Sequence, residues 1–194
     1  MKAVSRPHAG RHADISLRLA RPEDDRAIRD VIYAAFQNHP HHAPGATPSE
    51  HLIAGQLRDA GILTLSLVAE RGREIVGHLA VSPVEISGGD ADRPGPKQSD
   101  PSVPGWYGLG PVAVAPRCQN CGIGSAMVRH GVDVLHQQQA AGLVVLGEPH
   151  FYHRFGFRAE NCLTLPGIPP AYFMALPICG TLATGIVKYH PAFG

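Results

Sequence analysis

Residues 112–126 read Val-Ala-Val-Ala-Pro-Arg-Cys-Gln-Asn-Cys-Gly-Ile-Gly-Ser-Ala, and this stretch decides the fold. The apolar run that ends at Val114 predicts a strand, and the apolar residues after Gly122 recur at helical spacing. The first N–H groups of a helix have no partner within it and lie at its positive dipole end. The stretch therefore predicts a strand, a turn and a helix whose start can bind a pyrophosphate.

Short glycine patterns of this kind also occur in ordinary tight turns. A dinucleotide-binding fold would need three glycines and an acidic residue about 20 positions further on. A mononucleotide-binding loop would need Gly-Lys-Ser or Gly-Lys-Thr. The sequence has neither pattern, so both of these nucleotide-binding folds are excluded.

Strands and helices alternate on both sides of this stretch. Strands are expected at 15–19, 63–70, 74–84, up to Val114, and at 143–146; helices are expected from Pro22 to Asn38, from Pro48 to Gly61, from Gly122 to Ala140, and just before Phe155. The pair 63–70 and 74–84 predicts an antiparallel hairpin, and the order strand, helix, strand after Pro111 predicts a parallel pair. The sequence therefore predicts one α/β domain over residues 15–194, with a mixed central sheet flanked by helices.

Composition narrows the class of protein. Of 194 residues, 44% are hydrophobic and the formal net charge is +1, which indicates a globular chain with no basic surface for nucleic acid or membrane. No apolar run approaches the roughly 20 residues that span a bilayer, and a secretory signal is not recognisable. We expect a cytoplasmic protein with four reduced cysteines, and a mobile extension over residues 1–14.

The stretch also resembles motif A of the GNAT acetyltransferases, Gln/Arg-x-x-Gly-x-Gly/Ala after a strand. Gln119, Gly122 and Gly124 stand at the motif positions. The resemblance covers most of residues 15–194, is specific between 105 and 158, and implies the GNAT fold with a splayed and bulged fourth strand. Gly110 and Pro111 fit the bulge, since proline cannot donate to a sheet ladder and glycine often marks such irregularities.

The resemblance implies acetyl-CoA as the co-substrate. The N–H groups of residues 119–125 would hold its pyrophosphate, and the backbone of Val112 and Val114 would pair with pantetheine like an added strand. The implied cofactor-binding residues are Val112, Ala113, Val114, Gln119, Asn120, Cys121, Gly122, Ile123, Gly124 and Ser125. Cys118 and Cys121 would lie near the phosphates, or have no role.

Phe151–Phe157 resembles the family's Tyr-x-x-x-Gly-Phe element, with Tyr152 and Gly156 correctly spaced. The implied role of Tyr152 is general acid toward the departing thiolate; the alternative is an aromatic core residue. For the general base, Glu148 at the end of the strand 143–146 is the first candidate, and Glu85 at the far end of the strand 74–84 is the second. Either glutamate could instead be a solvated surface group.

Two sets of histidines and the C-terminal run complete the candidates. His78 is a weaker base candidate, equally readable as a strand residue with a satisfied imidazole. His39, His41 and His42 have loop spacing, so no designed metal site is expected. The run from Pro166 to Phe193 resembles a bacterial subgroup of predicted acetyltransferases. It is expected to add a last strand near 186–189 and to line the acceptor pocket. Further candidates for the lining of this pocket are Phe36, His39 and Tyr172.

The expected function is transfer of an acetyl group from acetyl-CoA to a primary amine of a small molecule or protein. The amine would attack directly in a ternary complex, with no metal. Two alternatives stay open: transfer of a longer acyl group, and a non-catalytic CoA-binding sensor or interaction module. No nucleic-acid or membrane partner is expected, and the sequence leaves a homodimer open.

Overall fold

The computed structural model describes residues 15–37, 47–88 and 105–194. Its central sheet has six strands in the order β1-β2-β3-β5-β6-β8, and β5–β6 is its one parallel pair. The strands are β1 (Ile15–Leu19), β2 (Leu65–Arg71), β3 (Glu74–Pro83), β5 (Trp106–Val114), β6 (Gly142–Leu146) and β8 (Phe173–Pro177). The mixed sheet, the β2–β3 hairpin and the parallel pair are confirmed.

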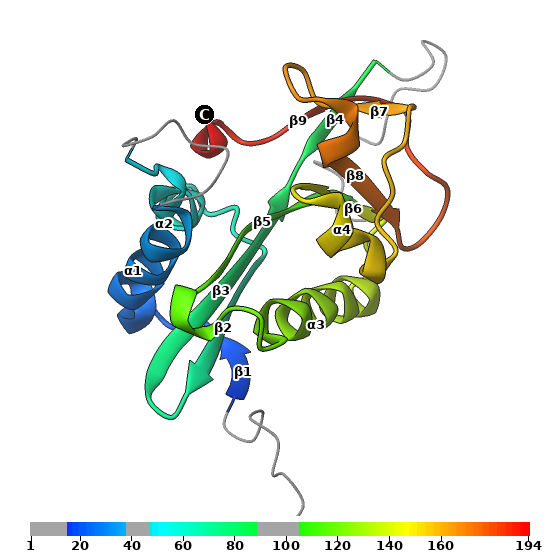
Figure 1. Ribbon diagram of the computed structural model, residues 1–194. Helices are drawn as coiled ribbons and strands as arrows, with labels where there is room; N and C mark the ends of the chain where they lie inside the picture. The colour runs from blue at the N-terminus through cyan, green and yellow to red at the C-terminus, as the bar shows by residue number, and fades with distance from the viewer. Residues whose placement is uncertain (1–14, 38–46, 89–104) are drawn as a thin grey trace, which may run out of the picture.

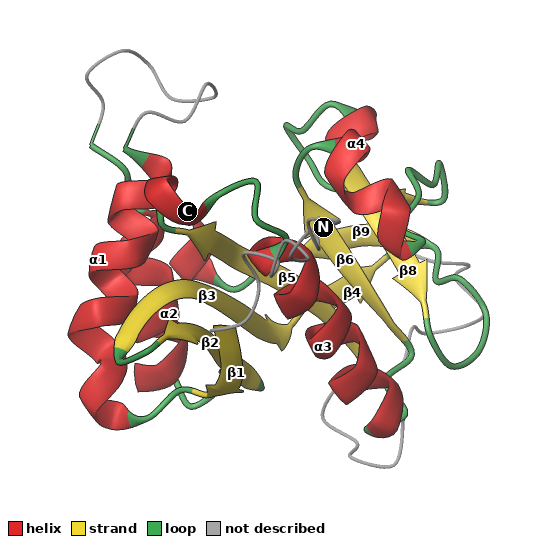
Figure 2. Cartoon of the chain, turned by 60° about the horizontal axis from the view of Figure 1, so that its bottom comes forward, coloured by secondary structure: helices red, strands yellow, loops and turns green. Residues whose placement is uncertain are grey.

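Helices cover both faces of this sheet (Figures 1 and 2). On one face lie α1 (Asp25–Phe36), preceded by the 3₁₀ turn η1 (Pro22–Asp24), and α2 (Glu50–Asp59); on the other lie α3 (Ile123–Gln137) and α4 (Pro149–Tyr152). The apolar stripe of α1 packs with Val68 and Ala113, and that of α3 packs with Leu79 and Leu109. Each helix is therefore held by burial of one apolar stripe rather than by its own propensity.

A second sheet of three short strands extends the molecule. Its order is β4-β9-β7, with β4 (Glu85–Ser87), β9 (Gly185–Lys188) and β7 (Leu163–Thr164). The last strand was expected near 186–189, and β9 confirms it. The expected strand 74–84 ends one residue early, and Glu85 opens β4 instead of lying at the end of that strand. β4, β7 and β8 were not expected, because each is short and lies close to prolines or glycines.

The strand β5 is irregular where the sequence predicted it. Leu79 faces Val112 and Val81 faces Leu109 across the β3–β5 ladder, so β5 carries one extra residue at Gly110–Pro111. This is a β-bulge. On its other edge β5 pairs with β6 only from Trp106 to Gly108, whereas β6 continues its ladder with β8 as far as Leu146. The splayed, bulged fourth strand of the central sheet is confirmed.

Several predictions fall outside the described residues. These are the mobile extension at 1–14 and the three histidines 39, 41 and 42.

Candidate active site

The turn between β5 and α3 leaves helix N–H groups without a helical partner. The chain leaves Val114 through the 3₁₀ turn η2 (Pro116–Cys118) and reaches the N-cap Gly122, whose φ of +80° favours glycine. The first helical bond in α3 runs from Ala126 N to Gly122 O at 2.9 Å. The N–H groups of residues 123–125 therefore have no intrahelical acceptor, and the buried side chain of Ile123 holds them in place.

Gln119 closes this turn back onto the strand. Its N–H donates to Pro116 O at 3.3 Å, and its Nε2 donates to Val114 O at 3.0 Å. Gln119, Asn120 and Gly122 are exposed, whereas Cys118 is buried in the main core. The motif glutamine thus shapes the turn, and the Cys118 thiol packs in the interior rather than beside a phosphate site.

The open edge of β5 lies directly before the turn. Ala115 N donates to Val76 O of β3 at 2.9 Å. Alternate residues of a strand direct their backbone groups to opposite edges, so Val112 and Val114 direct theirs away from β3, where β6 has separated. Val114 O on this edge accepts from Gln119 Nε2, and the remaining backbone groups of Val112 and Val114 can pair with an extended partner.

Gly124 has a packing role that the motif alone did not indicate. A Cβ at Gly124 would lie 3.4 Å from Phe151 Cζ, so the α4 ring packs against the start of α3 there. Phe151 also makes edge contacts with Tyr152 at 4.9 Å and Phe155 at 5.3 Å between ring centroids. This aromatic group ties α4, and with it Tyr152, to the proposed phosphate-binding turn.

Tyr152 lies at the C-terminal end of β6 with its ring buried. A Cβ at Gly147 would lie 2.4 Å from Tyr152 Cε2, and Phe157 contacts the ring at 5.8 Å between centroids. Burial raises the pKa of the Tyr152 phenol above its ordinary value. The hydroxyl is therefore protonated over the whole physiological range, which is the state a proton donor requires.

The two candidate bases lie in different elements, one at the start of α4 and one in β4, and both are exposed. Glu148 is the N-cap of α4, and its carbonyl accepts from Phe151 N at 3.0 Å and Tyr152 N at 3.2 Å. Glu148 is thus anchored next to the segment that carries Tyr152. Glu85 opens β4 and faces Lys188 across the β4–β9 ladder.

His78 is a core residue of the α1 and α2 side. It is 0% exposed, and its Nε2 lies 2.9 Å from Ser66 Oγ. Burial, assisted by the charge of Arg58, lowers the pKa of His78 to about 3. The imidazole is therefore neutral at physiological pH.

Sequence reasoning missed two hydroxyls beside the point where β5 and β6 separate. The ring of Tyr189 lies over Gly108, and Ser82 faces Gly108 across the β3–β5 ladder. Tyr189 belongs to the C-terminal run that was expected to line the acceptor pocket, and Ser82 was not a candidate. A glycine inside a strand is the one signal that could have pointed to a close neighbour there.

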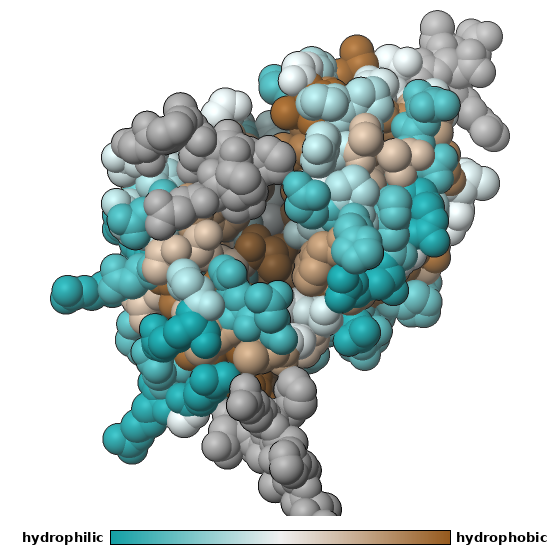
Figure 3. Space-filling model, in the orientation of Figure 1, coloured by the Kyte–Doolittle hydropathy of each residue, from teal (hydrophilic) through white to brown (hydrophobic). Residues whose placement is uncertain are grey.

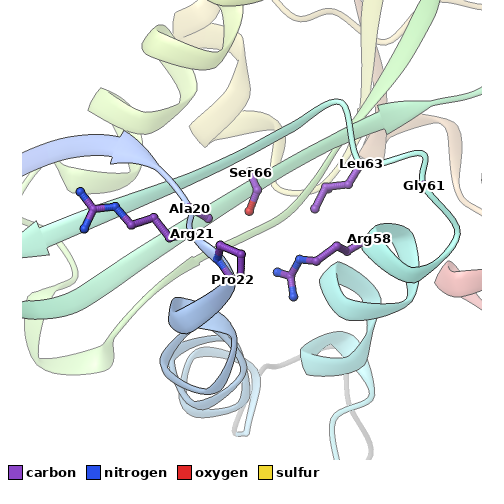
Figure 4. Close-up of a pocket in the computed structure, with 7 residues that line it drawn as sticks. All are labelled: Ala20, Arg21, Pro22, Arg58, Gly61, Leu63 and Ser66. Carbon is purple, nitrogen blue, oxygen red and sulfur yellow. The ribbon is translucent and has the colours of Figure 1, made fainter.

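Figure 3 shows a hollow with an apolar floor between the half of the molecule that carries α1 and the half that carries α3. A second hollow of about 310 Å³, drawn in Figure 4, is lined by Ala20, Arg21, Pro22, Arg58, Gly61, Leu63 and Ser66. It contains none of the predicted site residues, and its Arg58 pairs with Asp25 at 2.5 Å. Within the described ranges, no three His, Cys, Asp or Glu side chains are grouped to hold a metal ion.

Known proteins share this architecture. The model of the acetyltransferase (GNAT) domain matches residues 63–159. The chain belongs to the GNAT acetyltransferase family. A GNAT family acetyltransferase from Brucella melitensis, solved in complex with acetyl-CoA, has 38% sequence identity and a TM-score of 0.74, covering 94% of this chain and 100% of that one.

Two further GNAT comparisons involve one Escherichia coli protein. The uncharacterized N-acetyltransferase YhbS of strain K12 is 32% identical over 184 residues, 91% of this chain and 97% of YhbS. Its crystal structure in complex with CoA superposes with a TM-score of 0.76 and covers 96% of each chain. The GNAT assignment makes the protein an acyl-CoA-dependent N-acyltransferase. None of the helices described for it is long and apolar enough to cross a membrane.

Proposed function

We propose that the protein transfers an acetyl group from acetyl-CoA to a primary amine by direct attack in a ternary complex. The observation that carries this proposal is the separation of β5 from β6 after Gly108, directly before the unpaired N–H groups of α3. An extended pantetheine pairs with the open edge at Val112 and Val114 while the pyrophosphate meets residues 123–125. The relatives solved with acetyl-CoA and CoA support this cofactor.

The bulge at Gly110–Pro111 supports activation of the thioester. A bulge leaves its extra residue out of the ladder and turns backbone groups away from the neighbouring strand. An N–H of β5 beside the bulge hydrogen-bonds the thioester carbonyl oxygen, which stabilises the negative charge that develops there during attack.

In the transfer step one bond to the carbonyl carbon forms and one breaks. The lone pair of the amine nitrogen attacks the carbonyl carbon, the C–N bond forms, and the C–S bond breaks with its electron pair on sulfur. Tyr152 gives its proton to that sulfur, and CoA leaves as the thiol. The proton lost by nitrogen goes to Glu148, directly or through water; Glu85 is the second candidate for this base.

The acceptor is a small-molecule or protein amine, and the same geometry admits a longer acyl chain if the space beside Val112 is wide enough. The contrasting candidate is a CoA-binding sensor without turnover. The protonated phenol of Tyr152, held beside the end of β6, favours the enzyme.

Binding and turnover measured together test the proposal. Calorimetric titration with acetyl-CoA is expected to show one site per chain, and mass spectrometry is expected to detect the acetylated product of at least one amine in a broad panel. Mass spectrometry is preferable to thiol reagents because the chain carries four free cysteines. Binding without product from any amine would favour the sensor, and no binding would refute the proposed cofactor site.

A further inference from the structure

Tyr189 follows β9 and brings a phenol to the point where the two parallel strands separate. A Cβ added to Gly108 would lie 2.3 Å from Tyr189 Cε1, so the Tyr189 ring rests directly on this glycine. Gly108 is the last residue of β5 that pairs with β6. A segment remote in the sequence therefore lines the start of the opening between β5 and β6.

The C-terminal residues hold this ring in place. Phe193, in the 3₁₀ turn η5 (Pro191–Phe193), contacts the Tyr189 ring at 4.8 Å between centroids. His190 Nδ1 accepts from Ala192 N at 3.2 Å and closes the turn. The turn packs against α2, as Figure 1 shows beside the C label.

Two buried hydroxyls in this place have no hydrogen-bond partner among the described residues. One is the Oη of Tyr189, and the other is the Oγ of Ser82, whose side chain is 0% exposed. Ser82 faces Gly108 directly across the ladder, so its side chain is on the face that the Tyr189 ring covers. An unpaired buried hydroxyl costs about 1–3 kcal/mol, so two neighbouring ones indicate a polar group supplied by a ligand.

These hydroxyls lie on the opposite face of the sheet from Tyr152. Leu109 belongs to the core cluster of Tyr152 and α3, and successive strand residues point to opposite faces, so Gly108 points the other way. Burial, and in smaller part the charge of Tyr152, raise the pKa of Tyr189 above its ordinary value. The Tyr189 phenol is thus neutral and able both to donate and to accept a hydrogen bond.

We propose that the hydroxyls of Tyr189 and Ser82 bind the nitrogen of the acceptor amine, on the face of β5 opposite Tyr152. This inference rests on the proposed acetyl transfer and names the part of the chain that orients its second substrate. Neutral hydroxyls accept N–H bonds without the charge that would hold the nitrogen as an ammonium ion, so its lone pair stays available. Tyr189 and Ser82 act as acceptor-binding residues, and Phe193 positions Tyr189.

Tyr189→Phe and Ser82→Ala test this assignment, with Tyr33→Phe and Ser16→Ala as matched controls on α1 and β1. The probes are n-butylamine, spermidine and a tetrapeptide with a free N-terminus. With an amine that the wild type acetylates, each test variant is expected to raise KM for the amine about tenfold while the Kd for acetyl-CoA changes less than twofold. Thermal stability should stay equal or rise, because the removed hydroxyls have no partner among the residues that the structure describes.

Each outcome decides the question. An unchanged KM in both test variants, or an equal loss of acetyl-CoA affinity, would overturn the assignment. If Tyr189→Phe fails to fold, Ser82→Ala decides by the same measurements. If the wild type acetylates no amine, the proposed function fails separately. Calorimetry of the same amines with the CoA complex then still compares amine binding between the wild type and the variants. Equal binding by the wild type and the variants, or no binding, would reject the two hydroxyls as the amine site.

Discussion

At the scale of single residues, the site depends on side chains whose protonation is set by burial. Burial of its ring makes Tyr152 hold its proton more strongly than an ordinary phenol, and burial keeps His78 neutral although it is a base. Desolvation disfavours the charged form in both cases, so it raises the pKa of the phenol and lowers that of the imidazole. Burial therefore keeps Tyr152 in its protonated form and removes His78 from acid–base chemistry.

Replacement of Tyr152 by phenylalanine tests the general acid. Phenylalanine keeps the ring that packs against Gly147 and Phe157, so the fold and the Kd for acetyl-CoA are expected to stay near wild type. Loss of the proton donor should lower kcat about 100-fold or more. Steady-state kinetics with Tyr33→Phe as control measures this; an unchanged kcat would assign Tyr152 to packing alone.

His78 predicts a pH dependence of stability. Its pKa in the folded protein, about 3, lies below the value of about 6.5 for an unfolded histidine, so between these values the unfolded chain binds a proton that the native state does not. The free energy of unfolding should therefore fall as the pH drops below about 6.5, by up to about 1.4 kcal/mol per pH unit from this group.

Denaturant titrations from pH 7 to pH 4 measure this effect. His78→Gln should show a shallower fall than wild type, whereas His130→Gln, at an exposed position on α3, should follow the wild-type curve. Identical slopes for all three proteins would show that His78 does not carry the dependence.

At the scale of elements, glycines allow aromatic rings from other parts of the chain to pack directly on the backbone. An added Cβ would clash with Tyr189 at Gly108 and with Tyr152 at Gly147. A ring can approach the backbone this closely only where no Cβ intervenes, so these contacts set how the helix α4 and the C-terminal segment lie against the sheet. The arrangement places two phenols near the same opening from opposite faces.

Gly147→Ala tests the packing of the Tyr152 ring against the backbone of Gly147. The added Cβ would lie 2.4 Å from the ring, which must shift, and overpacking of this kind typically costs about 1–3 kcal/mol of stability. We expect kcat to fall along with the free energy of unfolding. Gly55→Ala in α2 is the matched control: its Cβ meets nothing within 4 Å, and it should stabilise the helix by up to about 1 kcal/mol.

At the scale of the whole molecule, the cofactor is expected to contact both halves of the fold, which meet where β5 and β6 separate. β1, β2 and β3 with α1 lie on one side of the opening, and β6 and β8 with α4 lie on the other (Figure 2). A ligand paired with the edge of β5 and bound at the start of α3 adds contacts between them. Binding should therefore be visible as increased stability of the entire fold.

Thermal unfolding with increasing acetyl-CoA measures this stabilisation. At a ligand concentration 100 times Kd, the free energy of unfolding should rise by about 2.7 kcal/mol. Gly122→Ala should need more acetyl-CoA for the same rise, because alanine disfavours the φ of +80° and disturbs the first N–H groups of α3. An equal response of both proteins would argue against the proposed pyrophosphate contact at this turn.

The sequence predicted those features that depend on neighbouring residues. The strand, turn and helix of residues 112–126, the bulge at Gly110–Pro111 and the β2–β3 hairpin follow from periodicity and from glycine and proline, whose effects are local. Glu85 was assigned to the end of a strand that stops at Pro83, since a break between two short extended segments has little local signal. The roles of Tyr152, Glu148 and Glu85 remain predictions.

The sequence by itself therefore determined the fold family and the chemistry of the turn before α3, because a helix start with glycine N-caps carries its anion site in the backbone. Only the tertiary structure decided that β5 leaves β6 at Gly108 and that Tyr189 covers this glycine beside Ser82. Those contacts join segments far apart in the chain. They depend on how side chains from distant segments pack against each other. No run of consecutive residues specifies that packing.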